Sequence, residues 1–408
     1  EILKDGASSI YGSDAVAGVV NIITKKQDGG EIDLYVSQPE RAGGEEYRVN
    51  GSWGKTWNGG SFRGTVDYYK KEELAKGQRE YFDCGEAYIF DQTTGARADL
   101  IDHRTGKTQC RDWGWGHVWT YDYAAGLGDG TTNLPSKSGA TLVQYDYTGK
   151  LKGFIPSVNE LADPNNPYHM RTPEGWYPVN YDHDSASVYQ FDHPFQNQDT
   201  LIPSTERTTV MAEFEQELTD NMTFYAETLF NRRETYGNHY SQFWSYTYND
   251  NFSTYGYYYG DTAEEALVPA GGLNQGAANE GWTGAQWMSP TPVSDHYDDS
   301  QKVDYYRFVA GLKGDFGGDS DWSYDMAFQY SKSDAEYWSE FIYDDAIQSQ
   351  NNVIWWNGVP GSCVGKTTSV RGIPCIDLPW LTSEFMRGNF SAEEEAFMYG
   401  EETGTTIY

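Results

Sequence analysis

The chain contains 408 residues, with 29 Lys and Arg against 61 Asp and Glu, which gives a net charge of −32 at pH 7. That balance excludes a protein that binds nucleic-acid phosphates, because such binding needs a basic surface. Aromatic residues make up 16% of the chain, more than a disordered acidic protein contains. The low mean hydropathy excludes a helical membrane protein. Soluble domains and a transmembrane β-barrel, whose strands are individually only weakly apolar, both remain.

The two ends of the sequence indicate an internal piece of a longer polypeptide. The chain begins at Glu1 without an initiator Met and without a signal peptide. It ends at Tyr408 inside an alternating, strand-like pattern. We therefore expect the natural protein to extend beyond this sequence.

Alternation of apolar and polar residues, the signal of a β-strand with two different faces, recurs along the chain. It predicts seven strands and the beginning of an eighth close to Tyr408. Most of them approach the about 9–11 residues that a tilted strand needs to cross a bilayer. The predicted ranges are 31–37, 47–53, 62–69, 208–218, 222–233, 303–312 and 322–331.

The connections between these strands have two very different lengths. Three are tight and rich in turn-forming residues: 56–60, 219–221 and 317–321. Three are very long: 72–206, 234–301 and 334–403. After the second predicted strand, short and long connections alternate, as in an outer-membrane barrel with tight periplasmic turns and long extracellular loops. A soluble antiparallel sheet with one wet face is the alternative, and it is disfavoured because loops this long are uncommon in compact domains.

The two faces of the predicted strands agree with a barrel. Glu213, Glu215 and Glu217 fall on one face, which suits a water-filled lumen and would be very costly against lipid. Aromatic residues gather near strand ends, as an aromatic girdle requires; they are Tyr68, Tyr69, Tyr225, Trp322 and Tyr330.

Residues 1–26, EILKDGASSIYGSDAVAGVVNIITKK, do not follow the barrel pattern. They combine glycine-rich bends with the apolar β run 19–23. The sequences KDGASS, YGSDA and GVVNIIT within this segment resemble, almost residue for residue, the end of the plug domain of TonB-dependent outer-membrane receptors. The strand pattern begins directly afterwards, where the barrel of that family begins.

This resemblance implies the fold and the function. Such a receptor is a transmembrane antiparallel β-barrel of about 22 strands in the outer membrane of a Gram-negative bacterium, beside lipopolysaccharide, with a plug domain in its lumen. It imports a scarce nutrient, and TonB with ExbB and ExbD supplies the energy by acting on the plug. Residues 1–26 would then be the C-terminal end of the plug and residues 27–408 the first part of the barrel with its extracellular loops. The TonB box and the other strands would lie outside this fragment.

Within the resemblance, the turn residues of the plug end are candidates for coupling, as structural hinges and lumen contacts; they are Gly6, Tyr11, Gly12, Asp14 and Gly18.

The four cysteines form two sequence-local pairs, each inside one long connection. Cys84 and Cys110 share the first, and Cys363 and Cys375 share the third. Of the three possible connectivities, local disulfides are favoured, in keeping with an oxidising compartment. A zinc site is the alternative, but the spacings match no zinc signature.

Clusters of aromatic residues in the long connections are candidates for ligand contact. Stacking on sugar rings or on the planar groups of a siderophore is the functional interpretation. Packing of one loop against another is the structural one, and it is favoured for any single residue. The candidates are Trp113, Trp115, Trp119, Tyr257, Tyr258, Trp355 and Trp356.

No cofactor is expected, apart from a possible structural calcium ion in the loops. Asp182 and Asp184 are weak calcium candidates, since carboxylates bind this ion but the spacing of a calcium loop is missing. The pairs 298–299 and 344–345 are similarly acidic. Solvated acidic surface is the favoured interpretation of all of them.

No enzyme motif is present, so catalysis is not expected. A ferric siderophore or a similar iron complex is the commonest cargo of the family that the chain resembles. The acidic, aromatic loops suit a neutral oligosaccharide as well. The alternatives from another class are a surface adhesin and a glycan-binding β protein without transport.

Overall fold

The protein is described by a computed structural model, in which the large sheet and parts of its connections are placed. The long described ranges are 28–82, 193–245, 287–317, 322–350 and 363–408. The shorter ones are 2–3, 19–20, 89–99, 101–102, 106–108, 116–121, 142–147, 149, 151–153, 155–162, 164–165, 170–178, 247–248 and 281–282.

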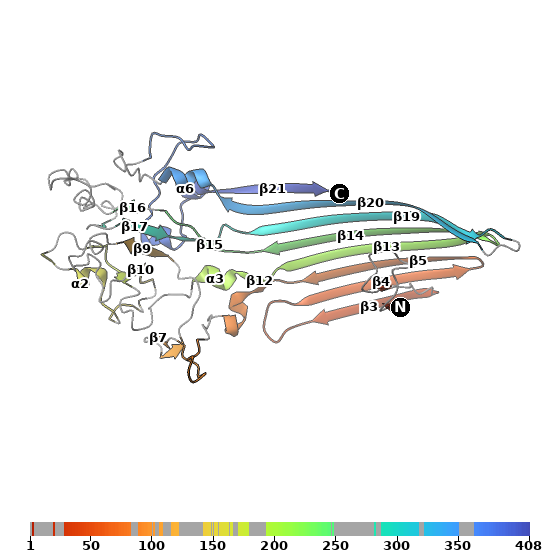
Figure 1. Cartoon of the computed structure of the whole chain (residues 1–408), viewed down its shortest axis with the longest axis horizontal. Helices are drawn as coiled ribbons and strands as arrows, with labels where there is room; N and C mark the ends of the chain where they lie inside the picture. Colours follow the sequence, from red (N-terminus) through yellow and green to blue (C-terminus); the bar gives the residue numbers. More distant parts are fainter. Residues whose placement is uncertain are drawn as a thin grey trace.

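The chain is an all-β protein dominated by one antiparallel sheet of eight strands (Figure 1). Each strand pairs with the strand that follows it in the sheet, so the order β3-β4-β5-β13-β14-β19-β20-β21 is also the chain order. This confirms the predicted all-β, antiparallel fold class, and the seven predicted strands with the beginning of an eighth. The strands are Gly29–Ser37, Glu46–Trp57, Gly60–Lys71, Ser204–Thr219, Met222–Gly237, Asp299–Asp315, Ser323–Ile342 and Tyr399–Ile407.

Several strands are longer than their apolar alternation predicts. β20 continues to Ile342, whereas the pattern predicts an end near Ser331. Its extra residues pair with β19 and β21 over Asp334–Ile342. Backbone pairing needs no apolar face, so the sheet extends past the region in which side chains alternate in polarity. The third connection therefore covers 343–398 rather than 334–403.

All long connections leave the sheet at one end and the tight turns lie at the other (Figure 1). The turn between β4 and β5 is Asn58-Gly59, and Gly59 has a φ of 72°, which the mirror-image turn of a two-residue hairpin requires. β13 and β14 are joined by Asp220-Asn221. The predicted alternation of short and long connections is present in the described strands.

The long connections contain secondary structure of their own. β9, β10 and β11 from the first connection form a five-stranded sheet with β16 and β17 from the second. Their bounds are His117–Tyr121, Leu142–Tyr145, Trp176–Pro178, Thr247–Tyr248 and Trp287–Thr291. Smaller strands are β6 (Leu74–Ala75), β7 (Ile101–Asp102), β8 (Lys107–Thr108), β12 (Thr200–Ile202), β15 (Ser241–Gln242) and β18 (Val293–Ser294).

Among the described residues, seven short helices complete these connections, four in the first and three in the third. They are η2 (Lys76–Gln78), η3 (Glu80–Phe82), α2 (Val158–Leu161), α3 (Pro194–Gln198), α6 (Asp344–Gln350), α7 (Ser383–Met386) and α8 (Ala392–Met398). Among the described residues, no helix is long and apolar enough to span a lipid bilayer.

The main hydrophobic core lies among the long connections and not on the large sheet. Val118 and Trp176 come from the first connection, Trp282 and Met288 from the second, and Phe385 from the third, and all five are buried. The indole N–H of Trp282 donates to the carbonyl of Leu381 at 3.0 Å. The three connections therefore form one packed body, here called the loop assembly. This packing is the structural role that sequence analysis favours for loop aromatics.

Histidines tie the loop assembly together where it meets the sheet. His239 Nδ1 lies 3.1 Å from Asp199 Oδ1, and His239 Nε2 lies 3.2 Å from Asp299 Oδ1. The His296 ring stacks on Tyr399 with ring centroids 4.3 Å apart. The acidic residue Asp299 is thus engaged by a protein partner.

At the N-terminus, β1 (Ile2–Leu3) pairs antiparallel with β2 (Val19–Val20). Val19 and Val20 are extended, as the apolar run 19–23 predicts. The candidate coupling residues Gly6, Tyr11, Gly12, Asp14 and Gly18 lie outside the described residues.

Candidate functional site

Cross-strand register gives the large sheet one apolar and one polar face. On the apolar face, Val66, Val210, Phe230 and Tyr306 lie directly opposite one another across four strands. Many side chains of this face are exposed to the surroundings; they include Ile32, Leu34, Val36, Val49, Val66, Val210, Phe308, Met326 and Phe328.

The polar face is crossed by ion pairs and hydrogen bonds between neighbouring strands. Lys313 Nζ lies 2.8 Å from Glu215 Oε1, and the Tyr225 hydroxyl donates to Asp325 at 2.6 Å. Glu213 and Glu217 lie on the same face as Glu215, as predicted. These carboxylates therefore point away from the apolar face.

A row of arginine and tyrosine side chains crosses the polar face next to the long connections. The register places Tyr35, Arg48, Tyr69, Arg207 and Arg233 opposite one another on β3, β4, β5, β13 and β14. We call these five residues the arginine row. No carboxylate belongs to it, although the chain as a whole has a net charge of −32.

Asp67 on β5 holds two members of the arginine row. It is 7% exposed. Its Oδ2 accepts from Arg48 Nε at 2.6 Å and from Asn50 Nδ2 at 3.1 Å, while Arg207 Nη2 lies 3.8 Å from Oδ1. The Arg207 guanidinium also stands over the ring of Tyr69, 5.4 Å from its centroid. One buried carboxylate and one ring thus orient two guanidinium groups.

These side chains line a groove of about 580 Å³ on the polar face. Four members of the arginine row and three polar neighbours line it: Asp33, Tyr35, Glu46, Arg48, Asn50, Tyr69 and Arg207. Glu46 is paired with Lys71 at 2.9 Å. The groove therefore offers cationic hydrogen-bond donors and two phenol rings, which is a suitable lining for an organic anion.

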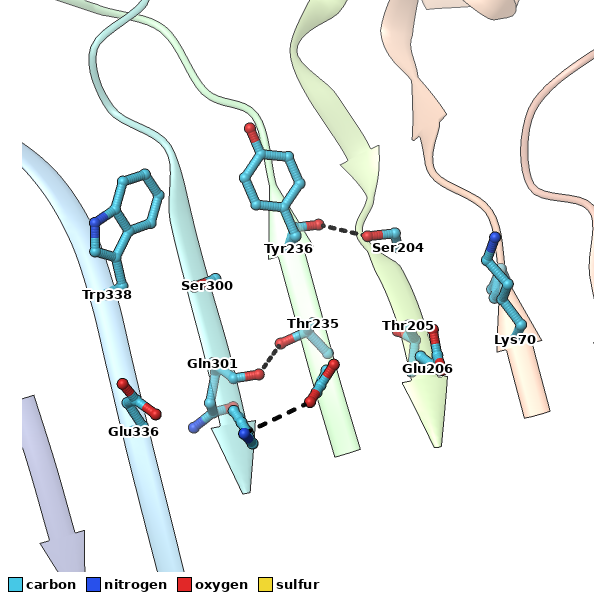
Figure 2. Close-up of a pocket in the computed structure, with 13 residues that line it drawn as sticks. Lys70, Ser204, Thr205, Glu206, Thr235, Tyr236, Ser300, Gln301, Glu336 and Trp338 are labelled. Atoms are coloured by element: carbon cyan, nitrogen blue, oxygen red, sulfur yellow. Dashed lines mark hydrogen bonds and ion pairs between the residues drawn. The ribbon is translucent and has the colours of Figure 1, made fainter. Parts of the chain in front are cut away.

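A second groove, of about 450 Å³, lies at the same end of the sheet, mainly on the apolar-face side. Figure 2 shows Tyr236 and Trp338 beside Ser300, with Glu336 and Lys70 at opposite sides. Here Lys302 Nζ lies 4.0 Å from Glu234 Oε1, and Lys70 pairs with Glu72 at 2.7 Å. Charged groups thus appear on this face where its apolar rows stop, and they largely pair with one another.

The predicted disulfide of the third connection is present. Cys363 and Cys375 are bonded, with both side chains buried in the main core. They are therefore not zinc ligands. Cys84 and Cys110 lie outside the described residues.

Asp345 is part of a buried ion pair, which corrects its interpretation as solvated acidic surface. Its Oδ1 accepts from Arg371 Nε at 2.8 Å and its Oδ2 accepts from the Arg371 backbone N–H at 2.9 Å. Burial by itself raises the pKa of Asp345, but the hydrogen bonds from Arg371 and Thr368 and the guanidinium charge outweigh it, so the pKa is lowered.

Of the aromatic ligand candidates, Trp119 on β9 lies in the described part, with 39% of its surface exposed. It pairs in register with Ser289 of the second connection. The other aromatic candidates lie outside the described residues; they are Trp113, Trp115, Tyr257, Tyr258, Trp355 and Trp356. The calcium candidates Asp182 and Asp184 also lie outside the described residues. In the described part of the chain, no group of three or more His, Cys, Asp and Glu residues could hold a metal ion.

The arginine row was missed by sequence analysis. A usable signal existed, because Arg48 lies on the polar side of the predicted strand 47–53, and Arg207 directly precedes the predicted strand 208–218 in phase with its polar side. The predicted barrel makes these two strands neighbours, but nothing in the sequence gives their register, since 132 residues, 72–203, separate β5 from β13.

Comparison with known proteins gives little further support. No family model matches the sequence, and no curated protein matches it. Among solved structures, the crystal structure of the siderophore receptor PiuA from Acinetobacter baumannii is similar at 11% identity, with a TM-score of 0.18. The match covers 85% of this chain and 54% of PiuA, so the chain spans about half the length of that receptor. At this TM-score the similarity does not show that the two proteins share a function.

Proposed function

We propose that the chain forms part of the wall and the outer loops of an outer-membrane receptor that imports a scarce nutrient. The first candidate for this nutrient is a ferric siderophore or a similar iron complex. TonB, with ExbB and ExbD, supplies the energy. In this proposal residues 1–26 are the end of a plug, and Gly6, Tyr11, Gly12, Asp14 and Gly18 couple it to transport.

The exposed apolar face of the large sheet is the observation that carries the proposal. Ile32 is 75% exposed, Leu34 is 73% exposed and Phe328 is 65% exposed. A soluble sheet covers such a face with a second layer, because apolar surface in water is unfavourable. Lipid chains would cover it equally well. On β13 the apolar side chains of this face begin at Val210 and end at Leu218. This length suits the about 9–11 residues of a tilted membrane strand.

The position of the loops supports the same function. The long connections gather at one end of the sheet (Figure 1) and fold into the loop assembly. The arginine row crosses the strands at the same end. A ligand that enters between the loops would meet the polar face next. Import of an oligosaccharide by the same mechanism is the second candidate, favoured by Trp119 on β9, which is 39% exposed.

Uptake in intact cells tests this function. Cells that carry the complete gene are compared with cells that lack it, in strains with and without TonB, using iron-55 siderophores and labelled oligosaccharides. We expect accumulation of one cargo class only when both the protein and TonB are present. Uptake that does not change when TonB is removed would contradict the proposal, and cell adhesion without uptake would favour the adhesin.

A further inference from the structure

We propose that Arg48 and Arg207 form a fork that binds a carboxylate group of the cargo. This inference rests on the function proposed above, and it deepens it by naming the chemical class of the ligand. It implies that the cargo is an anion, in spite of the acidity of the chain.

Asp67 holds the two arginines in place but does not use all of their hydrogen-bond donors. Arg48 Nε donates a hydrogen bond to Asp67 Oδ2 at 2.6 Å. Within the described residues, the two terminal nitrogens of Arg48 have no hydrogen-bond partner. Arg207 approaches the same carboxylate no closer than 3.8 Å. Their side chains are 49% and 42% exposed, while the side chain of Asp67 beneath them is 9% exposed. The fork is therefore preorganised, with donors left over for a ligand.

Other arginines of the protein use more of their donors in hydrogen bonds within the protein. Arg232, on the apolar-face side of β14, donates from Nε and from Nη2 to the two oxygens of Asp304, both at 2.7 Å. Arg371 donates to Asp345 and to the carbonyl of Phe397. Each of these has a structural carboxylate of its own, whereas Arg48 and Arg207 share Asp67.

The charges around the groove favour a carboxylate over a phosphate. Asp33 and Glu46 also line the groove, and Glu46 is neutralised by Lys71 at 2.9 Å. Asp33 and Asp67 balance the charges of the two arginines, so the groove has no excess positive charge for a doubly charged phosphate, and a singly charged carboxylate is the better match. A carboxylate also matches the planar fork of a guanidinium. The rings of Tyr35 and Tyr69 would contact the body of the ligand.

Carboxylates occur in two kinds of cargo, carboxylate-bearing iron complexes and uronate oligosaccharides. The complete protein, purified in detergent, is titrated calorimetrically with ferric citrate, with oligogalacturonate and with neutral oligogalactose. We expect one of the two anions to bind and the neutral sugar not to bind. Whichever anion binds identifies the source of the carboxylate. Equal affinity for the neutral sugar, or no binding of either anion, would overturn the inference.

Variants assign the binding to the fork. Arg48→Gln and Arg207→Gln should each weaken binding of the anion about tenfold or more, as expected for lost hydrogen bonds to a charged group. Arg307→Gln is the matched control, since Arg307 lies on the same face outside the groove and pairs with Glu227 at 3.5 Å; its affinity should equal that of the wild type. Unchanged affinity in both fork variants would contradict the proposal.

A milder variant guards against loss of folding. Arg48→Lys keeps a positive charge beside Asp67 and removes the fork, so it should fold normally but bind the anion more weakly than the wild type.

Uptake measurements separate this inference from the function that it rests on. Binding that depends on the fork, combined with uptake that ignores TonB, would reject the transport mechanism and keep the site. TonB-dependent uptake of a neutral cargo would reject the site and keep the mechanism.

Discussion

At the residue scale, Arg371 holds the third long connection together. Its side chain bonds Asp345 of α6 and the Phe397 carbonyl of α8, and its guanidinium lies 3.6 Å from the centroid of the Tyr343 ring. Asp345 is 2% exposed, so removal of its partner would leave a buried charge unpaired. We expect Arg371→Met to destabilise this region by about 3–5 kcal/mol, measured as faster proteolysis within 343–398.

The exposed pair of Arg387 and Glu384, 3.7 Å apart, provides the control for that substitution. Arg387→Met should cost less than about 1 kcal/mol, because solvent screens the pair. Equal protease sensitivity of the two variants would mean that the buried pair does not stabilise the third connection.

The same ion pair predicts an acid dependence. The pKa of Asp345 is lowered in the folded protein by its hydrogen bonds with Arg371 and Thr368. Its stabilisation is therefore complete above the ordinary aspartate pKa of about 3.9 and is lost as the pH falls below it. Tryptophan fluorescence of the loop assembly between pH 7 and pH 2 measures this loss. Asp345→Asn should flatten the acid limb, and an identical acid profile would disprove the assignment.

At the element scale, the Cys363–Cys375 disulfide closes a short segment of the third connection. The bond lies in the main core, beside Gln350 of α6, whose amide donates to the Ile376 carbonyl at 2.8 Å. We expect Cys363→Ala with Cys375→Ala to destabilise this connection by about 2–4 kcal/mol, seen as loss of amide-exchange protection. Val364→Ala, at a 65% exposed position, should change little; the strands of the large sheet should keep their protection in both variants.

At the scale of the whole molecule, the apolar face and the polar face differ in what they tolerate. Phe328 and Ala327 are neighbours on β20 and lie on opposite faces. If lipid covers the apolar face, Phe328→Arg should cost about 2–4 kcal/mol of stability in the membrane. Ala327→Arg should be tolerated, because Asp325 lies two residues away on the polar face. The amount of folded protein in the outer-membrane fraction measures both.

A soluble sheet would behave differently under these two substitutions. Both arginines would then be hydrated, and neither would lower the amount of folded protein. That outcome would reject the interpretation as a membrane protein and would favour the glycan-binding alternative.

The sequence alone determined the strands, the tight turns and the local disulfide of the third connection. These features depend on contacts between residues close in the chain: the alternation along 222–233, the turn at Asn58-Gly59, and the short separation of Cys363 and Cys375. Period-2 alternation and turn chemistry are local, so they can be read from sequence.

Only the tertiary structure decided the length of β20, the loop assembly and the arginine row. β20 continues to Ile342 because neighbouring strands supply backbone partners, whatever the side-chain pattern. Trp176, Trp282 and Phe385 share a core although each comes from a different connection. Arg48 and Arg207 share Asp67 because register brings β4 and β13 to the two sides of β5. The register of strands that are joined by a long connection has no local signature, and this is why the candidate site could not be predicted from the sequence.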